Sequence, residues 1–139
     1  MKREVVIIGA GPAGLAAAIE ATKNGCEVLL IDENRTAGGQ FFKQLHKFFG
    51  SQAHSAGIRG FEIGKQLLKE TEELGVEVWL QSSVIGIFAG KRVAVLRNGR
   101  TETIEAQSIL ICTGGAENPL RFPGWTLPGV MGEIGRAHV

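Results

Sequence analysis

The chain is poor in the features that mark disulfide-bonded, membrane-spanning or nucleic-acid-binding proteins. Its 139 residues include only two cysteines, Cys26 and Cys112, and no C-x-x-C pair, which is typical of buried thiols in a reducing cytosol. No run reaches about 18 uninterrupted apolar residues, so no membrane span is predicted. The 15 basic and 14 acidic residues form no basic cluster that would indicate a nucleic-acid partner. We therefore predict a cytoplasmic protein and assign no metal ligands.

Glycine, by contrast, is abundant at 20 residues, and three glycines form the most informative motif in the chain. They belong to a G-x-G-x-x-G at residues 9–14, which follows the apolar run 5–8 and precedes the small-residue stretch 15–19. Between a strand and a helix, Gly9 permits a tight turn, Gly11 lets a pyrophosphate approach the backbone and Gly14 lets the helix pack on the strand. The helix N-terminus adds free N–H groups and a positive dipole end. The motif predicts the dinucleotide-binding residues Gly9, Gly11, Pro12, Ala13 and Gly14.

An acidic residue follows the next apolar run at the distance expected for ribose binding. Residues 28–31 are all apolar, and Asp32 comes directly after them, eighteen positions beyond Gly14. Dinucleotide-binding folds place an acid about 20 residues after the glycines, where it bonds a ribose hydroxyl and repels the 2′-phosphate of NADP. Asp32 is the first candidate and Glu33 the second, and the alternative is that both only begin a polar loop. We expect Asp32→Ala to weaken cofactor binding more than Glu33→Ala.

Apolar periodicity along the rest of the chain predicts an α/β domain. Buried parallel strands are expected at 4–8, 27–31, 76–80 and 108–112, and helices at 12–24, 61–74 and, as a short aromatic segment, 41–49. Antiparallel strands are expected at 84–88, 92–97 and 101–106, because Ala89-Gly90 and Asn98-Gly99 mark turns between them. The predicted fold is a doubly wound, Rossmann-like parallel sheet in which a three-stranded antiparallel meander serves as one crossover.

This arrangement resembles the FAD-binding domain of the two-dinucleotide-domain flavoproteins, the superfamily of glutathione reductase and thioredoxin reductase. The resemblance rests on the glycine motif, Asp32, the Gly38-Gly39-Gln40 turn and the segment Ile111-Cys112-Thr113-Gly114, and it covers residues 4 to 131. It implies FAD in this domain, with NAD(P) in a second domain that this sequence lacks. Beyond the glycine motif, the cofactor residues that it implies are Asp32, Glu33, Gly39, Gln40, Val84, Thr113 and Gly114.

A narrower resemblance lies in residues 117–131, which read E-N-P-L-R-F-P-G-W-T-L-P-G-V-M. In the FAD-containing components of amine and amino-acid dehydrogenases, a similar stretch follows the motif that corresponds to Ile111-Cys112-Thr113-Gly114. These components are of the sarcosine oxidase α, opine oxidase and hydrogen cyanide synthase type. The resemblance implies an amine, amino acid or related small molecule as substrate and other oxidoreductase subunits as partners in a hetero-oligomer. A proline-rich surface linker is the alternative, and the two are compatible.

Two other functions stay open from the sequence. One is a thioredoxin-reductase-like disulfide reductase, although residues 40–43 are Gln-Phe-Phe-Lys where glutathione-reductase-type enzymes carry their cysteine pair. The other is a non-catalytic dinucleotide-binding module. No catalytic residue is assigned, because a flavin carries the hydride chemistry itself and histidines such as His46 are more often surface residues.

The end of the chain indicates an incomplete domain. No second G-x-G-x-x-G follows, and residues 133–139 have a reverse translation, GAG ATC GGA AGA GCA CAC GTC, that looks like a sequencing-library adapter. We predict that residues 1–116 are the first part of an FAD-binding domain, 117–132 a linker toward a second domain, and 133–139 a non-native tail that packs on nothing. The chain is then the N-terminal fragment of an FAD-dependent oxidoreductase and inactive alone. A genuine short C-terminus is the alternative.

Overall fold

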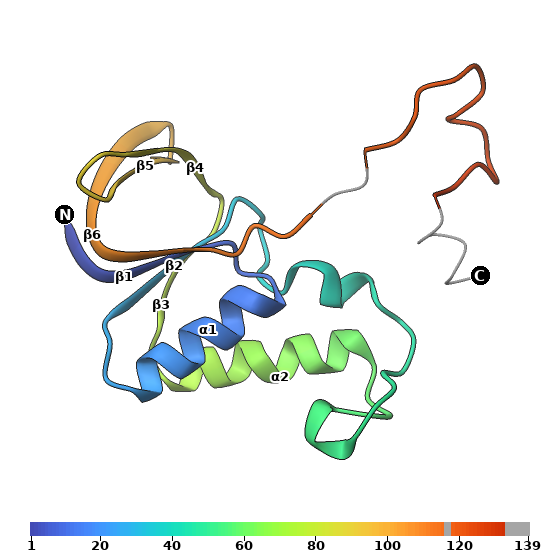
Figure 1. Cartoon of the computed structure of the whole chain (residues 1–139), viewed down its shortest axis with the longest axis horizontal. Coiled ribbons are helices and arrows are strands. Elements are labelled where there is room, and N and C mark those ends of the chain that lie inside the picture. The colour runs from blue at the N-terminus through green and yellow to red at the C-terminus, as the bar shows by residue number, and fades with distance from the viewer. Residues whose placement is uncertain (116–117, 133–139) are drawn as a thin grey trace.

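The computed structural model describes residues 1–115 and 118–132, and the predicted tail at 133–139 lies outside the described residues (Figure 1). It contains a six-stranded sheet in the order β3-β2-β1-β6-β5-β4. The strands are β1 (Lys2–Ile8), β2 (Val28–Ile31), β3 (Glu77–Trp79), β4 (Ser82–Phe88), β5 (Arg92–Arg97) and β6 (Arg100–Ile111). The helices are α1 (Pro12–Lys23) and α2 (Gly60–Glu73), with 3₁₀ turns η1 (Gly39–Lys43) and η2 (Gln52–His54). The predicted α/β class is confirmed.

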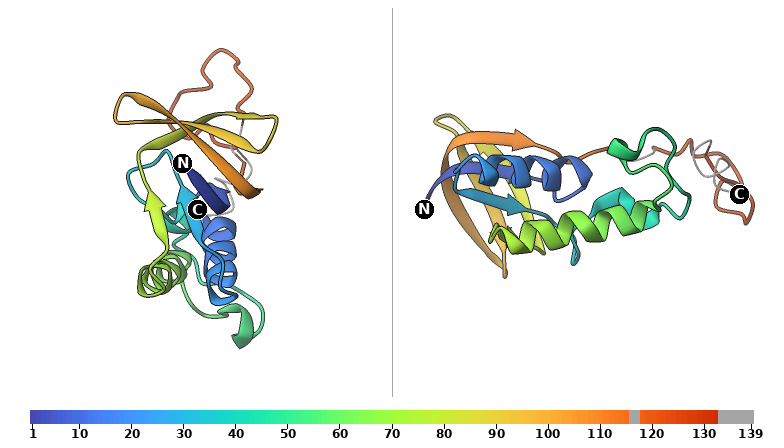
Figure 2. Two further views of the ribbon diagram at one scale, coloured as in Figure 1. Left: turned by 90° about the vertical axis from the view of Figure 1, so that its left-hand side faces the viewer. Right: turned by 90° about the horizontal axis from the view of Figure 1, so that it is seen from below.

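β1 and β2 are covered on both faces, as parallel strands usually are, whereas Leu110 and Ile111 at the end of β6 stay exposed. β1 pairs in parallel with β2 and β6, and β2 pairs in parallel with β3. Because side chains alternate along a strand, Ile7 of β1 packs with Leu15 of α1 on one face, whereas Val6 packs with Val93 and Ile104 of the meander on the other. The result is three layers, with α1 and α2 on one side of the parallel strands and the meander on the other (Figure 2).

A hydrogen-bonded ion pair joins α1 and α2 near their C-terminal ends. Lys23 in the last turn of α1 donates to Glu70 of α2 at 2.5 Å. The hydrogen bond and the charge of Glu70 raise the pKa of Lys23. Both helices were predicted from apolar periodicity, and their observed ends differ from the predicted ones by at most one residue.

The sequence prediction of two strands at 101–106 and 108–112 is wrong, because the structure forms one strand there. β6 runs without interruption for 12 residues and curves from the meander into the parallel sheet (Figure 1). Its first half pairs antiparallel with β5, from Arg100 to Glu105, and Glu105 through Ile111 pair in parallel with β1. Gln107 carries no turn preference that would break the strand, so the chain bends instead of stopping. The meander and the parallel strands therefore share one continuous sheet.

The predicted helix at 41–49 is also wrong beyond its first turn. η1 ends at Lys43, and Gln44 is extended, with φ −93° and ψ 102°. The chain then folds back so that the rings of Phe41 and Phe48 meet edge to face, with centroids 5.7 Å apart. An isolated antiparallel β-bridge between Lys47 and Arg59 joins the two ends of the loop that leads from η1 to α2. Tertiary aromatic packing, which periodicity does not report, overrides the local helical pattern.

Candidate functional site

A cleft opens at the carboxyl ends of β1, β2 and β6, beside the N-terminus of α1. Open α/β sheets bind ligands outside the carboxyl ends of their strands, and here α1 leads from β1 to β2 on one side while β6 pairs with β1 on the other. The cleft has a volume of about 680 Å³. A smaller cavity of about 160 Å³ adjoins it and shares Gly9, Asp32, Asn34 and Thr113 with it. Together they form an elongated site that extends from the start of β4 to η1.

The glycine turn is built so tightly that two of its glycines have no room for a side chain. Gly9 has a φ of +102°, and a Cβ on it would lie 2.4 Å from the carbonyl oxygen of Cys112. A Cβ on Gly14 would lie 1.8 Å from the carbonyl oxygen of Gly9. Gly11 differs, because a Cβ there would meet nothing within 4 Å. Gly9 and Gly14 therefore close the turn, whereas Gly11 leaves the backbone open toward the cleft.

The N-terminus of α1 presents unpaired donors to this opening. The helix begins at Pro12, and its first backbone hydrogen bond runs from Leu15 N–H to the Gly11 carbonyl at 2.9 Å. The N–H groups of Ala13 and Gly14 consequently have no acceptor within the helix. The first turn contains no acidic residue. Such an end favours an anion through its N–H groups and its positive dipole.

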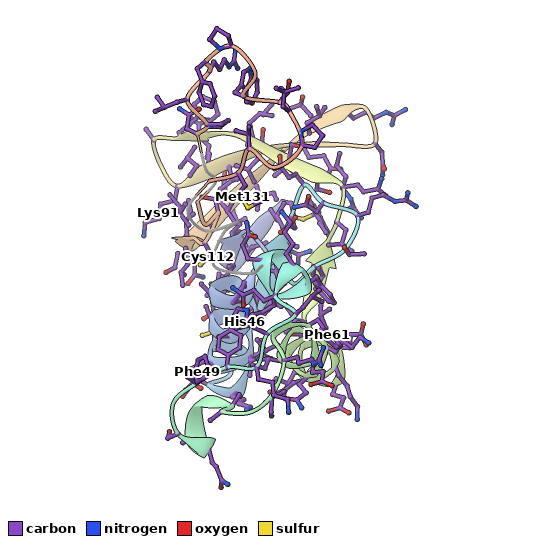
Figure 3. The ribbon with its side chains drawn as sticks, turned by 90° about the vertical axis from the view of Figure 1, so that its right-hand side faces the viewer. His46, Phe49, Phe61, Lys91, Cys112 and Met131 are labelled. Carbon is purple, nitrogen blue, oxygen red and sulfur yellow. The ribbon has the colours of Figure 1, made fainter. Side chains whose placement is uncertain are left out.

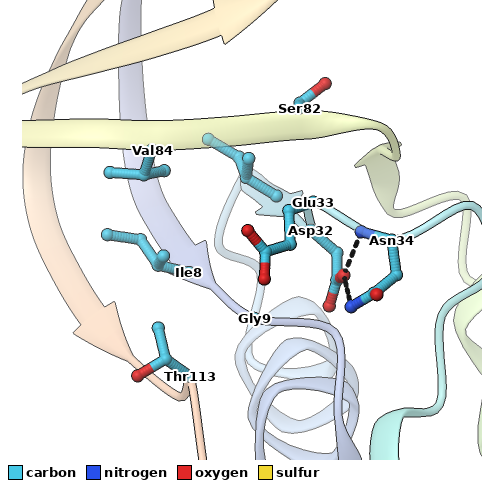
Figure 4. A pocket seen from close by; sticks show the side chains of 9 residues that line it. Ile8, Gly9, Asp32, Glu33, Asn34, Ser82, Val84 and Thr113 are labelled. Atoms are coloured by element: carbon cyan, nitrogen blue, oxygen red, sulfur yellow. Dashed lines mark hydrogen bonds between the residues drawn. The ribbon is translucent and has the colours of Figure 1, made fainter.

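The two acidic residues after β2 have different surroundings. Asp32 is 8% exposed, and one carboxylate oxygen accepts the Ala10 N–H at 2.6 Å. Its other oxygen accepts both the backbone and the side-chain N–H of Asn34 at 2.8 Å. Glu33 is exposed, and its carboxylate points into the smaller cavity, between Ile8 and the Gly9 turn (Figure 4). Asp32 therefore fastens the glycine turn to the end of β2, and Glu33 keeps its carboxylate available.

The second glycine pair packs directly on the first turn. Gly38 N–H donates to the Ala10 carbonyl at 2.6 Å. A Cβ on Gly39 would lie 2.9 Å from the Cα of Gly11. Gly38 and Gly39 have positive φ angles of 114° and 52°, and the ring of Phe42 occupies the space that a Cβ on Gly38 would need. This contact places η1 on the cleft, where Gln40 lines it.

The structure brings together almost all residues that the sequence singled out. Gly9, Gly11, Pro12, Ala13, Asp32, Gly39, Gln40, Thr113 and Gly114 line the larger cleft, and Glu33 and Val84 line the smaller cavity. Gly14 lines neither and packs beneath the turn. His46 and Phe49, labelled in Figure 3, lie on the segment after η1 and do not line the cleft.

Sequence reasoning missed several residues that line the two cavities. They are Ile8, Ile31, Asn34, Thr36, Lys43, Ser82 and Gly115. Asn34 and Thr36 could have been found, because they lie in the loop between the acid and the glycine pair. No local signal marks Lys43, because only the packing of η1 on the glycine turn brings it to the cleft.

Comparison with known proteins assigns the chain to a family. A family model described as pyridine nucleotide-disulphide oxidoreductase matches residues 3–136, and the chain belongs to this family. Over 136 residues it is 32% identical to an opine oxidase subunit of Agrobacterium tumefaciens (strain Ach5), covering 92% of this chain and 27% of that protein. Over 141 residues it is 33% identical to the hydrogen cyanide synthase subunit HcnB of Pseudomonas aeruginosa, covering 94% of this chain and 28% of that protein.

A solved structure with the same fold is L-proline dehydrogenase from P. horikoshii. It has a TM-score of 0.74 and 26% sequence identity, over 86% of this chain and 24% of that one. The chain spans about a quarter of the length of each of these three proteins. No helix among the described residues is long and apolar enough to cross a membrane.

Proposed function

We propose that the cleft binds FAD and that the protein of which this chain is the N-terminal part is an FAD-dependent oxidoreductase. The observation that carries the proposal is the glycine turn. Its backbone is open at Gly11 and closed at Gly9 and Gly14, and it faces the unpaired N–H groups of α1. Within the same proposal, residues 1–116 are the first part of the FAD-binding domain, and 117–132 lead toward a second domain that binds NAD(P).

The described residues fit the parts of FAD in order along the site. The small cavity, with Glu33 and Val84, suits the adenosine end, and the N–H groups at the start of α1 suit the pyrophosphate. Gln40 and Gly114 line the cleft beyond the glycine turn, toward the flavin half. FAD would supply the hydride chemistry, and the chain would supply binding and orientation.

Within this proposal, the ribose is held by Glu33 in preference to Asp32. The sequence favoured Asp32 because it ends the strand. The three hydrogen bonds that Asp32 already accepts leave it little capacity for a ligand, whereas Glu33 directs its carboxylate into the cavity. We assign Asp32 to positioning the glycine turn and Glu33 to the ribose hydroxyls.

The relatives support a small-molecule substrate and an enzyme of several subunits. The opine oxidase relative and HcnB are both named as subunits, and the structural relative is a dehydrogenase of an amino acid. We propose an amine, amino acid or related small molecule as substrate and a hetero-oligomer as the working enzyme. A disulfide reductase is less favoured by the two free cysteines. Cys26 precedes the amino end of β2 and Cys112 follows the carboxyl end of β6, so the two thiols lie at opposite ends of the parallel strands.

FAD binding can be tested on the protein expressed from the complete gene. We expect a yellow protein that releases FAD on denaturation, identified by its visible spectrum and by chromatography against FMN and riboflavin. A colourless protein that binds NAD and not FAD would contradict the proposal. A C-x-x-C in the remainder of the gene, with disulfide turnover, would favour the reductase instead.

The two cysteines allow a second test that needs no activity. Cys112 lines the cleft, whereas Cys26 lies at the other end of α1, and both are partly exposed. We expect FAD to slow alkylation of Cys112 in the apoprotein and to leave Cys26 unchanged, as measured by peptide mass spectrometry. Equal protection of both thiols would indicate global stabilisation, and no protection of Cys112 would place FAD elsewhere.

A further inference from the structure

The 3₁₀ turn η1 presents one polar face to the cleft. Residues three apart eclipse each other in a 3₁₀ helix, so Gln40 and Lys43 share a face, and both line the cleft. Phe41 lies on the other side, where its Cβ is 3.2 Å from the position of a Cβ on Gly64 of α2. η1 is therefore held between α2 and the glycine turn, and the direction of Lys43 follows from this packing.

Lys43 is the single cation among the described residues that line the two cavities. The charged groups that share this lining are the carboxylates of Asp32 and Glu33. None of the ion pairs among residues 1–115 and 118–132 involves Lys43. The pyrophosphate of a dinucleotide carries two negative charges, and a helix N-terminus supplies only about half a positive charge. Without Lys43, the side chains that line the site would carry two carboxylates and no cation, so Lys43 is the side-chain charge that offsets a bound pyrophosphate.

We infer that Lys43 is the counter-charge for the pyrophosphate of the bound dinucleotide, an inference that rests on the proposed FAD site. η1 begins at Gly39, which lies against Gly11 at the phosphate-binding turn. Lys43 is four residues further, about 8 Å along a 3₁₀ helix, and its flexible four-carbon stem can return toward the turn. The acidic end of the site then holds the ribose, and the cationic end neutralises the phosphates.

The inference can be tested by titrating the full-length apoprotein with FAD and with ADP, which carries the diphosphate without a flavin. We expect Lys43→Met to weaken both ligands by about tenfold or more, because a charge-assisted contact is lost. Lys43→Arg should keep most of the affinity, since it keeps the charge. The matched control is Lys47→Met, because Lys47 is an exposed lysine of the same segment that does not line the cleft. The loss in Lys43→Met should shrink as salt is raised.

The two ligands separate the inference from the proposed function. Weakened FAD with unchanged ADP would place Lys43 at the flavin and overturn the inference, as would unchanged binding of both ligands or an equal loss in Lys47→Met. A wild-type protein that binds ADP but not FAD would refute the proposed function, and the ADP titration of Lys43→Met would still decide the inference. A wild-type protein that binds neither ligand would overturn both.

Discussion

Replacing Gly14 with alanine is expected to destabilise the domain by about 3 kcal/mol or more and to abolish FAD binding. A Cβ at this position would lie 1.8 Å from the carbonyl oxygen of Gly9 and 3.0 Å from its carbonyl carbon. These atoms are backbone and cannot move aside as a side chain would, so α1 must shift away from β1. Such overpacking costs about 1–3 kcal/mol where relaxation is easy, and more where it is not. Chemical denaturation of the apoprotein measures the change in the free energy of unfolding.

The matched control is Gly11→Ala, which adds the same methyl group to the same turn. A Cβ on Gly11 meets nothing within 4 Å, and its φ of −78° suits alanine. We expect the stability to fall by only about 0.5–1 kcal/mol, the preference for glycine over alanine at a helix N-cap, while FAD affinity falls sharply because the methyl group occupies the path of the pyrophosphate. If Gly14→Ala were as stable as the wild type, or if Gly11→Ala bound FAD normally, the assigned roles of the two glycines would be wrong.

The second large effect is expected on replacing Asp32 or Glu33. One substitution should lower mainly the stability of the domain, and the other mainly its affinity for FAD. Asp32→Ala leaves the buried Ala10 N–H and Asn34 without their acceptor and should cost about 2–3 kcal/mol of stability, because hydrogen bonds to a charged group are lost. Glu33→Ala should leave stability within about 0.5 kcal/mol of the wild type, since its side chain is exposed. Its FAD affinity should fall by about tenfold or more.

Two measurements on the same apoprotein preparations decide between the acids. Chemical denaturation gives the stability of each variant, and FAD titration at a temperature well below unfolding gives the affinity. Glu33→Gln removes the charge with little change in shape and should resemble Glu33→Ala in affinity. If Glu33→Ala bound FAD like the wild type while Asp32→Ala stayed folded and lost FAD, the ribose would belong to Asp32, as strand position alone suggests.

Much of the site could be predicted because its constraints are local. The need for glycine at positions 9 and 14 follows from a strand that turns immediately into a helix, and the acid follows the second strand at a spacing set by one β-α-β unit. The roles within the acid pair could not be predicted. They depend on the N–H of Ala10, which lies 22 residues earlier in the chain and meets Asp32 only because β1 and β2 are neighbours.

By itself, the sequence determined the α/β class, the strand-turn-helix that opens the site and the position of both helices. These features follow from periodicity and from steric limits at single glycines, which act within a few residues. Only the tertiary structure decided that 100–111 is one curved strand, that the 41–49 segment leaves the helical path after Lys43, and that Lys43 faces the cleft. Each of these depends on contacts between segments distant in the chain: β6 with β1, Phe41 with α2, and Gly39 with Gly11. Such contacts form only when the layers pack, so they cannot be predicted from the apolar periodicity of a short segment.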